Sequence, residues 1–93
     1  MSDVFHALSS PTRRQILSLL KVRNMTAGDL ADHLSVSKPT LSGHFNVLKS
    51  ADLVITTRNG TSITYQLNTS VVEELLVLVA DLLKHDTNEV EQT

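Results

Sequence analysis

The chain contains no cysteine and no long hydrophobic run. The lack of cysteine excludes disulfide bonds and thiolate metal sites, and leaves histidine, aspartate and glutamate as the side chains that could hold a metal ion. No apolar segment is long enough to span a membrane, and no basic-then-apolar leader opens the sequence. We therefore expect a cytoplasmic protein with no membrane insertion.

The usual features of enzyme sites are missing as well. The serines have no accompanying arrangement of histidine and aspartate in the sequence, and the chain has no glycine-rich phosphate loop. The acids gather toward the C-terminus instead of around a plausible pocket. We expect no enzymatic activity and no cofactor.

Ninety-three residues make one small domain, which we assign to residues 1–85, followed by a polar tail at 86–93 that we expect to be disordered. The net charge of −2 is unevenly distributed: residues 1–68 carry seven bases against four acids, and residues 69–93 carry one base against six acids. Because charges act over a Debye length of about 8–10 Å, the basic part can still attract a polyanion.

Residues 26–50 predict two short helices joined by a tight turn. Thr26 and Asp29 form a variant of the capping box at the start of the first helix. Ser37 is the expected N-cap of the second helix, with Pro39 in its first turn, where a missing N–H costs nothing. Each helix has one apolar stripe at helical spacing, so the pair predicts a helix-turn-helix.

The second helix buries Leu41, Phe45 and Leu48 and presents short polar side chains with no long acid on its outer face. Such a helix fits the major groove of DNA. His44 lies at the edge of the buried stripe, where packing or a phosphate contact is favoured over metal binding. The predicted DNA-binding residues of this segment are Ser37, Lys38, Pro39, Thr40, Ser42, Gly43, His44 and Asn46.

Two helices are expected before this motif, over residues 3–8 and from Pro11 onward with Ser10 as N-cap. Arg13 and Arg14 near the start of the second helix are candidates for phosphate binding, while helix-capping ion pairs or plain solvation explain them equally well.

After the motif, residues 53–57 and 62–67 alternate apolar and polar side chains around an Asn-Gly pair, which predicts a β-hairpin. A two-residue turn would place Ile55 and Ile63 on opposite faces, and a three-residue loop would place them on one face. We slightly favour the latter. The hairpin forms a wing, and Arg58 and Asn59 near its tip are candidates for contacts with the DNA backbone or minor groove.

The last helix is expected to start near Ser70, which forms a capping box with Glu73, and to end near His85. Its apolar residues cover more than one stripe, which is too much for a helix on the surface of a small monomer. We expect part of this surface to meet another copy of the chain in a homodimer, and the family resemblance described below adds the first helix to that interface. The predicted interface residues are Val4, Phe5, Leu8, Val72, Leu75, Leu76, Val79, Leu82 and Leu83.

Two alternatives stay open. The last helix could dock a different protein, in which case the chain is a winged-helix protein-interaction module, and a regulatory protein partner is also conceivable for a dimeric regulator. His6, Asp81 and His85 could meet at the dimer interface as a zinc site, although they lack shared ligand spacing, and our main expectation is that the chain binds no metal.

The motifs together resemble the ArsR/SmtB family of winged-helix repressors. The matching segments are residues 5–9, 11–17, 37–45, 48–49 and 51–54, and the similarity extends over residues 3–83. Within that family the chain is most similar to small cysteine-free autorepressors of the sporulation-delay type. The resemblance implies a mainly helical winged helix-turn-helix, a dimer held by the first and last helices, and repression through a palindromic operator.

The chain departs from the metal-sensing members of this family. Some of them carry a cysteine pair in the first helix of the helix-turn-helix, where this chain has residues 30–33 with a single histidine. Others carry paired histidine and acidic ligands on the last helix, where only Asp81 and His85 are present. The resemblance therefore implies DNA binding without metal sensing.

Overall fold

The computed structural model of the chain describes the backbone of residues 2–92 and the side chains of residues 3–84. The elements, in chain order, are α1 (Ser2–Leu8), α2 (Pro11–Val22), β1 (Met25–Thr26), α3 (Ala27–Leu34), α4 (Lys38–Ser50), β2 (Val54–Asn59), β3 (Ser62–Leu67) and α5 (Thr69–Gln92). This order confirms the predicted winged helix-turn-helix and adds the short strand β1.

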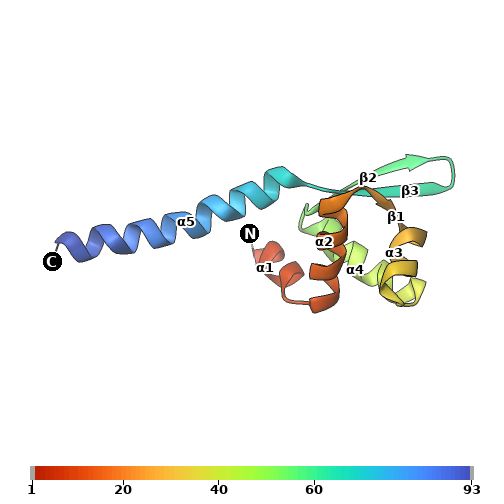
Figure 1. Cartoon of the computed structure of the whole chain (residues 1–93), viewed down its shortest axis with the longest axis horizontal. Coiled ribbons are helices and arrows are strands. Elements are labelled where there is room, and N and C mark those ends of the chain that lie inside the picture. Colours follow the sequence, from red (N-terminus) through yellow and green to blue (C-terminus); the bar gives the residue numbers. More distant parts are fainter. Residues whose placement is uncertain (1, 93) are drawn as a thin grey trace.

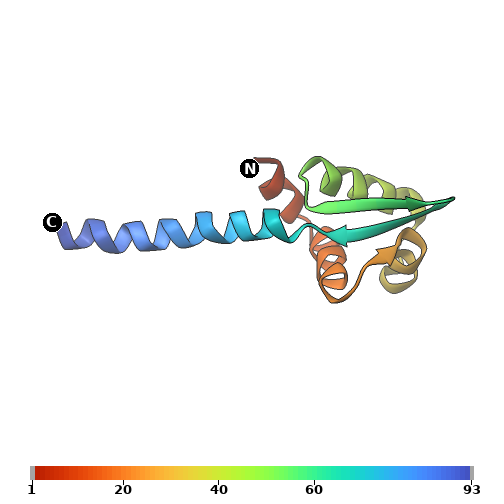
Figure 2. The same cartoon turned by 90° about the horizontal axis from the view of Figure 1, so that it is seen from above.

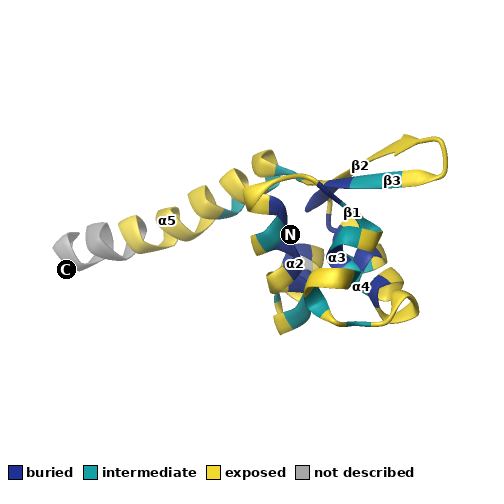
Figure 3. Cartoon of the chain, turned by 45° about the vertical axis from the view of Figure 1, so that its right-hand side comes forward, coloured by how far each residue is buried: buried dark blue, intermediate teal, exposed yellow. Residues whose placement is uncertain are grey.

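Helices α1 to α4 and the sheet form a body from which α5 projects as a single long helix (Figures 1 and 2). The molecule measures 59 × 22 × 21 Å, and its radius of gyration is 16.3 Å, against about 12 Å for a compact chain of this length. Val71 and Leu75, in the first turns of α5, pack against the core, and Figure 3 shows the helix exposed beyond them.

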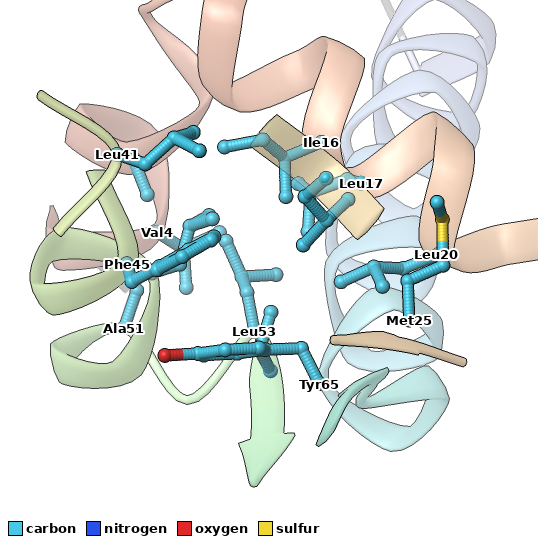
Figure 4. Packing of buried hydrophobic residues seen from close by; sticks show 14 residues of the cluster. Val4, Ile16, Leu17, Leu20, Met25, Leu41, Phe45, Ala51, Leu53 and Tyr65 are labelled. Atoms are coloured by element: carbon cyan, nitrogen blue, oxygen red, sulfur yellow. The ribbon is translucent and has the colours of Figure 1, made fainter. Parts of the chain in front are cut away.

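The core lies where α1, α2 and α4 meet the inner face of the sheet (Figure 4). Ile16 of α2, Leu30 of α3, and Leu41 and Leu48 of α4 are at most 1% exposed. The rings of Phe45 and Tyr65 stack with their centroids 4.2 Å apart and thereby attach the wing to α4. Fully burying side chains of this size contributes about 1.5–3 kcal/mol each.

The three strands form an antiparallel sheet in the order β1-β3-β2. Met25 pairs with Tyr65 and Thr26 pairs with Thr64, so β1 joins the residue that begins α3 to the middle of the wing. Sequence periodicity gives no signal for a strand of two residues, and the hairpin alone was predicted.

The preferred three-residue hairpin loop was wrong. Asn59 pairs with Ser62, so Gly60 and Thr61 form a two-residue turn, with Gly60 at φ +66°. A positive φ at the first central position is characteristic of a type II′ turn, where glycine is favoured. In this register Ile55 pairs with Gln66 and lies on the face opposite Ile63 and Tyr65, and its side chain is 44% exposed.

The predicted helix starts at Ser10, Thr26 and Ser37 are confirmed. Their hydroxyl oxygens accept hydrogen bonds from the backbone N–H groups of Arg13, Asp29 and Thr40, and Thr26 and Asp29 complete the capping box.

The last helix begins at Thr69, near Ser70 as predicted, but the predicted capping box of Ser70 and Glu73 was wrong, because Ser70 lies inside the helix. Asn68 anchors this end instead, donating from its backbone N–H to Leu53 O (2.9 Å) and from Nδ2 to Asp52 O (2.8 Å). The helix continues to Gln92, whereas we expected its end near residue 85. Residues 85–92 lie outside the described side chains, so the disorder predicted for residues 86–93 stays a prediction.

Candidate nucleic-acid interface

The N-terminal end of α4 is shaped by its own hydroxyl groups. Ser37 Oγ accepts from the backbone N–H of Thr40 at 3.4 Å and donates to Thr40 Oγ1 at 2.9 Å. Pro39 occupies the first turn, where no donor is required of it. The first turn is therefore held in one conformation before any ligand arrives, with Lys38 exposed beside it.

Two faces divide α4. Leu41, Phe45 and Leu48 point into the core, as predicted. The candidate DNA-binding residues on the opposite side are all exposed, namely Ser37, Lys38, Pro39, Thr40, Ser42, Gly43 and Asn46, whereas His44 is half-buried. The exposed side chains of this face are short hydrogen-bonding groups and one lysine, a set suited to base edges and phosphates in a major groove.

Gly43 leaves an open position in the middle of this face. A Cβ atom at Gly43 would have no neighbour outside the helix within 4 Å. The packing of the protomer therefore does not require glycine at position 43. Glycine also costs about 1 kcal/mol of stability in a helix interior. The open position lets the backbone of α4 come close to a partner surface.

The wing adds a second element to the same end of the molecule. Its tip and the N-terminal end of α4 both lie at the end opposite α5 (Figures 1 and 2). Arg58 was expected in the loop but belongs to β2, where it pairs with Ile63 on the sheet face that carries Tyr65. Arg58 and Asn59 are both exposed, so they are available for phosphates beside a groove occupied by α4.

Arg13 is not a surface residue available to phosphates, because it is 8% exposed and its side chain is committed to other helices. Its Nε donates to Ala7 O (2.8 Å), its Nη2 to His6 O (3.0 Å), and its Nη1 lies 3.2 Å from His44 Nδ1. A cation suits the C-terminal end of α1, because a helix presents the negative end of its dipole there.

The burial of Arg13 and its contact with α4 were missed at the sequence level, although the spacing of Arg13 held a signal. Arg13 stands three, four and seven residues before Ile16, Leu17 and Leu20, so it lies on the buried stripe of α2. Arg14, one position further, is exposed and donates from Nη1 to Leu8 O at 2.7 Å, adding a second cap to α1.

Burial, followed by the charge of Arg13, lowers the pKa of His44 below its ordinary value of 6.5. In the unfolded chain the imidazole regains that ordinary value, so the unfolded state binds the proton more tightly. The contribution of neutral His44 to the free energy of unfolding is therefore fully present above pH 6.5. It is lost as the pH falls from there through the lower pKa of His44 in the folded protein.

We therefore expect the free energy of unfolding to decrease as the pH falls below about 6.5. Urea unfolding at a series of pH values measures this decrease, with His44→Gln as the variant that lacks the titrating group. The difference in stability between the wild type and this variant should change with pH over this range. A constant difference would contradict the expected pKa shift.

A family model described as "Bacterial regulatory protein, arsR family" matches residues 10–56, from the N-cap of α2 into the wing. The chain belongs to the ArsR family. It is 44% identical over 89 residues to the transcriptional repressor SdpR of Bacillus subtilis, covering 96% of this chain and 99% of that protein.

Other comparisons agree with this assignment. The chain is 43% identical over 68 residues to the arsenical resistance operon repressor of Staphylococcus xylosus, covering 73% of this chain and 65% of the relative. An ArsR-like transcriptional regulator from Rhodococcus superposes with a TM-score of 0.80 at 28% identity, covering 98% of this chain and 89% of the other. The relatives named here are regulators by description, and this ArsR-family chain is a DNA-binding transcriptional regulator.

Metal binding is a separate question for an ArsR-family chain. Within residues 3–84 no three histidine, aspartate or glutamate side chains gather as a potential metal site. The side chain of His85 lies outside the described residues, so the alternative zinc site with His6 and Asp81 stays a prediction. None of the described helices is long and apolar enough to cross a membrane.

Helix α5 exposes most of the predicted interface. Large apolar side chains stand exposed on α5 and on α1, and the predicted members are Phe5, Val72, Leu76, Val79, Leu82 and Leu83. Leu8 and Leu75 are half-buried. Val4 is 5% exposed and belongs to the core of its own protomer, so its side chain is not available to a partner. The prediction omitted Val77 and Leu78, which are also exposed on α5.

Proposed function

We propose that this ArsR-family chain is a homodimeric repressor in which the α4 helices of two copies enter successive major grooves of a palindromic operator. The observation that carries the proposal is the exposed face of α4, whose polar groups stand on a helix fixed by three buried anchors. A two-fold dimer places its half-sites about 34 Å apart, which is one turn of the duplex.

The proposed dimer is formed by the predicted interface residues of α5 that are exposed, together with Phe5 of α1; those of α5 are Val72, Leu76, Val79, Leu82 and Leu83. Monomeric proteins rarely expose so many large apolar side chains on one helix. The described acids of α5, Glu73, Glu74 and Asp81, are exposed on an element distant from the wing tip and the start of α4. They therefore add solubility without bringing negative charge to the operator. Such a repressor acts in the cytoplasm, and the proposed activity involves no enzymatic step.

Selection of bound fragments from genomic DNA, including the gene's own upstream region, tests the proposal. We expect an imperfect palindrome that binds more tightly than a shuffled duplex of the same composition. Equal affinity for the two duplexes would remove the main support for an operator-binding repressor. A monomeric mass at micromolar concentration would instead favour the protein-interaction module.

Lys38→Gln is expected to weaken operator binding and to reduce its dependence on salt. If each Lys38 neutralises one phosphate, the slope of log K against log salt falls in magnitude by about 0.9 for each protomer. Lys84→Gln is the matched control, because Lys84 is also exposed but lies far along α5. Fluorescence anisotropy at several salt concentrations measures both slopes. An unchanged slope in Lys38→Gln would place this lysine away from the DNA backbone.

A further inference from the structure

The contact between Arg13 and His44 determines where the histidine carries its proton. Arg13 Nη1 lies 3.2 Å from His44 Nδ1. A guanidinium group has only donors and stays protonated, so Nδ1 must be the acceptor in this hydrogen bond. A neutral imidazole whose Nδ1 accepts carries its proton on Nε2. The ring is therefore an Nε2–H donor.

That donor has no acceptor among the described residues. In this part of the chain, the only hydrogen bond of the His44 imidazole is the one from Arg13. The described part of the chain contains no buried side-chain nitrogen or oxygen that lacks a partner, and His44 is half-buried. Nε2 must therefore be reached by solvent, where it can donate to a ligand.

The position of His44 fits an anionic ligand. His44 follows Thr40 by four residues, so the two side chains lie on the same side of α4, one turn apart. The guanidinium group of Arg13 places its positive charge next to the imidazole. A hydrogen bond accepted from Arg13 also polarises the ring and strengthens the Nε2–H as a donor.

We propose that the Nε2–H of neutral His44 donates to a phosphate oxygen of the DNA backbone, and that Arg13 is the positioning residue that fixes this tautomer. The inference rests on the proposed function, since it takes α4 as the helix that enters the groove. Arg13 is itself held by the carbonyl oxygens of His6 and Ala7, so the C-terminal end of α1 determines the placement of the donor.

Two substitutions at position 44 separate the two nitrogens of the ring. His44→Asn places an oxygen near the position of Nδ1, keeps an acceptor for Arg13, and removes the outward donor. His44→Gln places its amide nitrogen near the position of Nε2 and retains a neutral donor. We expect the asparagine variant to lose about tenfold or more in operator affinity for each half-site. The glutamine variant should stay within about threefold of the wild type.

Two further properties identify the acceptor as a backbone phosphate. A neutral donor releases no counterion, so His44→Asn should leave the slope of log K against log salt unchanged, in contrast to Lys38→Gln. A phosphate contact carries no sequence information, so affinity for the selected operator fragment and for its shuffled duplex should fall by the same factor. A fall confined to the operator would identify a base contact and overturn the phosphate assignment.

The positioning role of Arg13 is tested by nitrogen-15 NMR of the His44 ring at pH 7.5. We expect the wild-type protein to show the Nε2–H tautomer alone, and Arg13→Gln to show a mixture of both tautomers. An Nδ1–H tautomer or an imidazolium in the wild type would overturn the proposal. Should Arg13→Gln fail to fold, as judged by circular dichroism, the proposal is still tested by the tautomer in the wild-type spectrum and by the operator affinities of the two His44 variants.

Failure of this inference differs from failure of the proposed function. If the wild type prefers its operator over shuffled DNA and His44→Asn binds equally well, then only the inference falls. If the wild type shows no preference for any duplex, the proposed repressor function is wrong, whatever the tautomer of His44.

Discussion

Leu76→Glu is expected to convert the protein from a dimer into a monomer and to weaken operator binding by more than about a hundredfold. Leu76 is 67% exposed in the protomer, so the substitution leaves the core intact. In a two-fold interface the change occurs twice, and each buried leucine contributes about 1.5–3 kcal/mol. Two carboxylates placed in an apolar interface add a further desolvation cost. Sedimentation equilibrium measures the mass, and anisotropy measures the affinity.

Val77→Glu provides a matched control for this experiment. Val77 is 65% exposed and lies one position further along α5, so its exposure and helical context match those of Leu76. Helical geometry separates the two, because Leu76 continues the stripe of Val72 and Val79 whereas Val77 lies among charged side chains. The control should stay dimeric and bind DNA. Dissociation of both variants to the same extent, or of neither, would contradict an interface along the Leu76 stripe.

Gly43→Glu is expected to abolish operator binding, by more than about a hundredfold, while making the folded chain slightly more stable. A Cβ atom at position 43 would meet nothing within 4 Å among the described residues outside its own helix backbone, and replacing glycine inside a helix gains up to about 1 kcal/mol. The carboxylate would face phosphates and acceptor groups of the groove, and juxtaposed like charges cost several kcal/mol. The free energy of unfolding, measured in urea, should therefore rise, while the operator affinity, measured by anisotropy, should fall.

Gly43→Ala separates charge from close approach at the same site. A methyl group fills little of the open position, so its effect on affinity reports how near the backbone of α4 comes to DNA. A loss of tenfold or more would show close approach, and no loss would show that glycine is merely tolerated. Normal operator binding by Gly43→Glu would exclude this face of α4 from the groove.

The sequence predicted those parts of the fold whose signals are local. Thr26 with Asp29, and Ser37 with Pro39, specify helix starts within four residues, and both starts are found where they were expected. The helix-turn-helix and the exposed face of α4 follow from such signals. The apolar excess of α5 is likewise visible from composition alone.

The errors arose where distant parts of the chain decide the outcome. The three-residue loop was preferred because it gathers Ile55 with Ile63 and Tyr65. The observed register instead places Ile55 on the opposite face of the wing, where its side chain is 44% exposed. Arg13 was given equal odds of binding phosphate because its real partners lie on α1 and α4. Val4 was assigned to the interface, although the core of the protomer buries it.

The pairing of β1 with β3 has a consequence for how much variation in spacing the protein tolerates within an operator half-site. Thr26 is the N-cap of α3 and also pairs with Thr64 in the wing. The wing therefore cannot pivot without disturbing the start of the helix pair that carries α4. The wing and the helix pair therefore move as one rigid unit. An insertion or deletion between the base pairs that contact α4 and the phosphates that contact the wing cannot be accommodated by a movement of the wing alone.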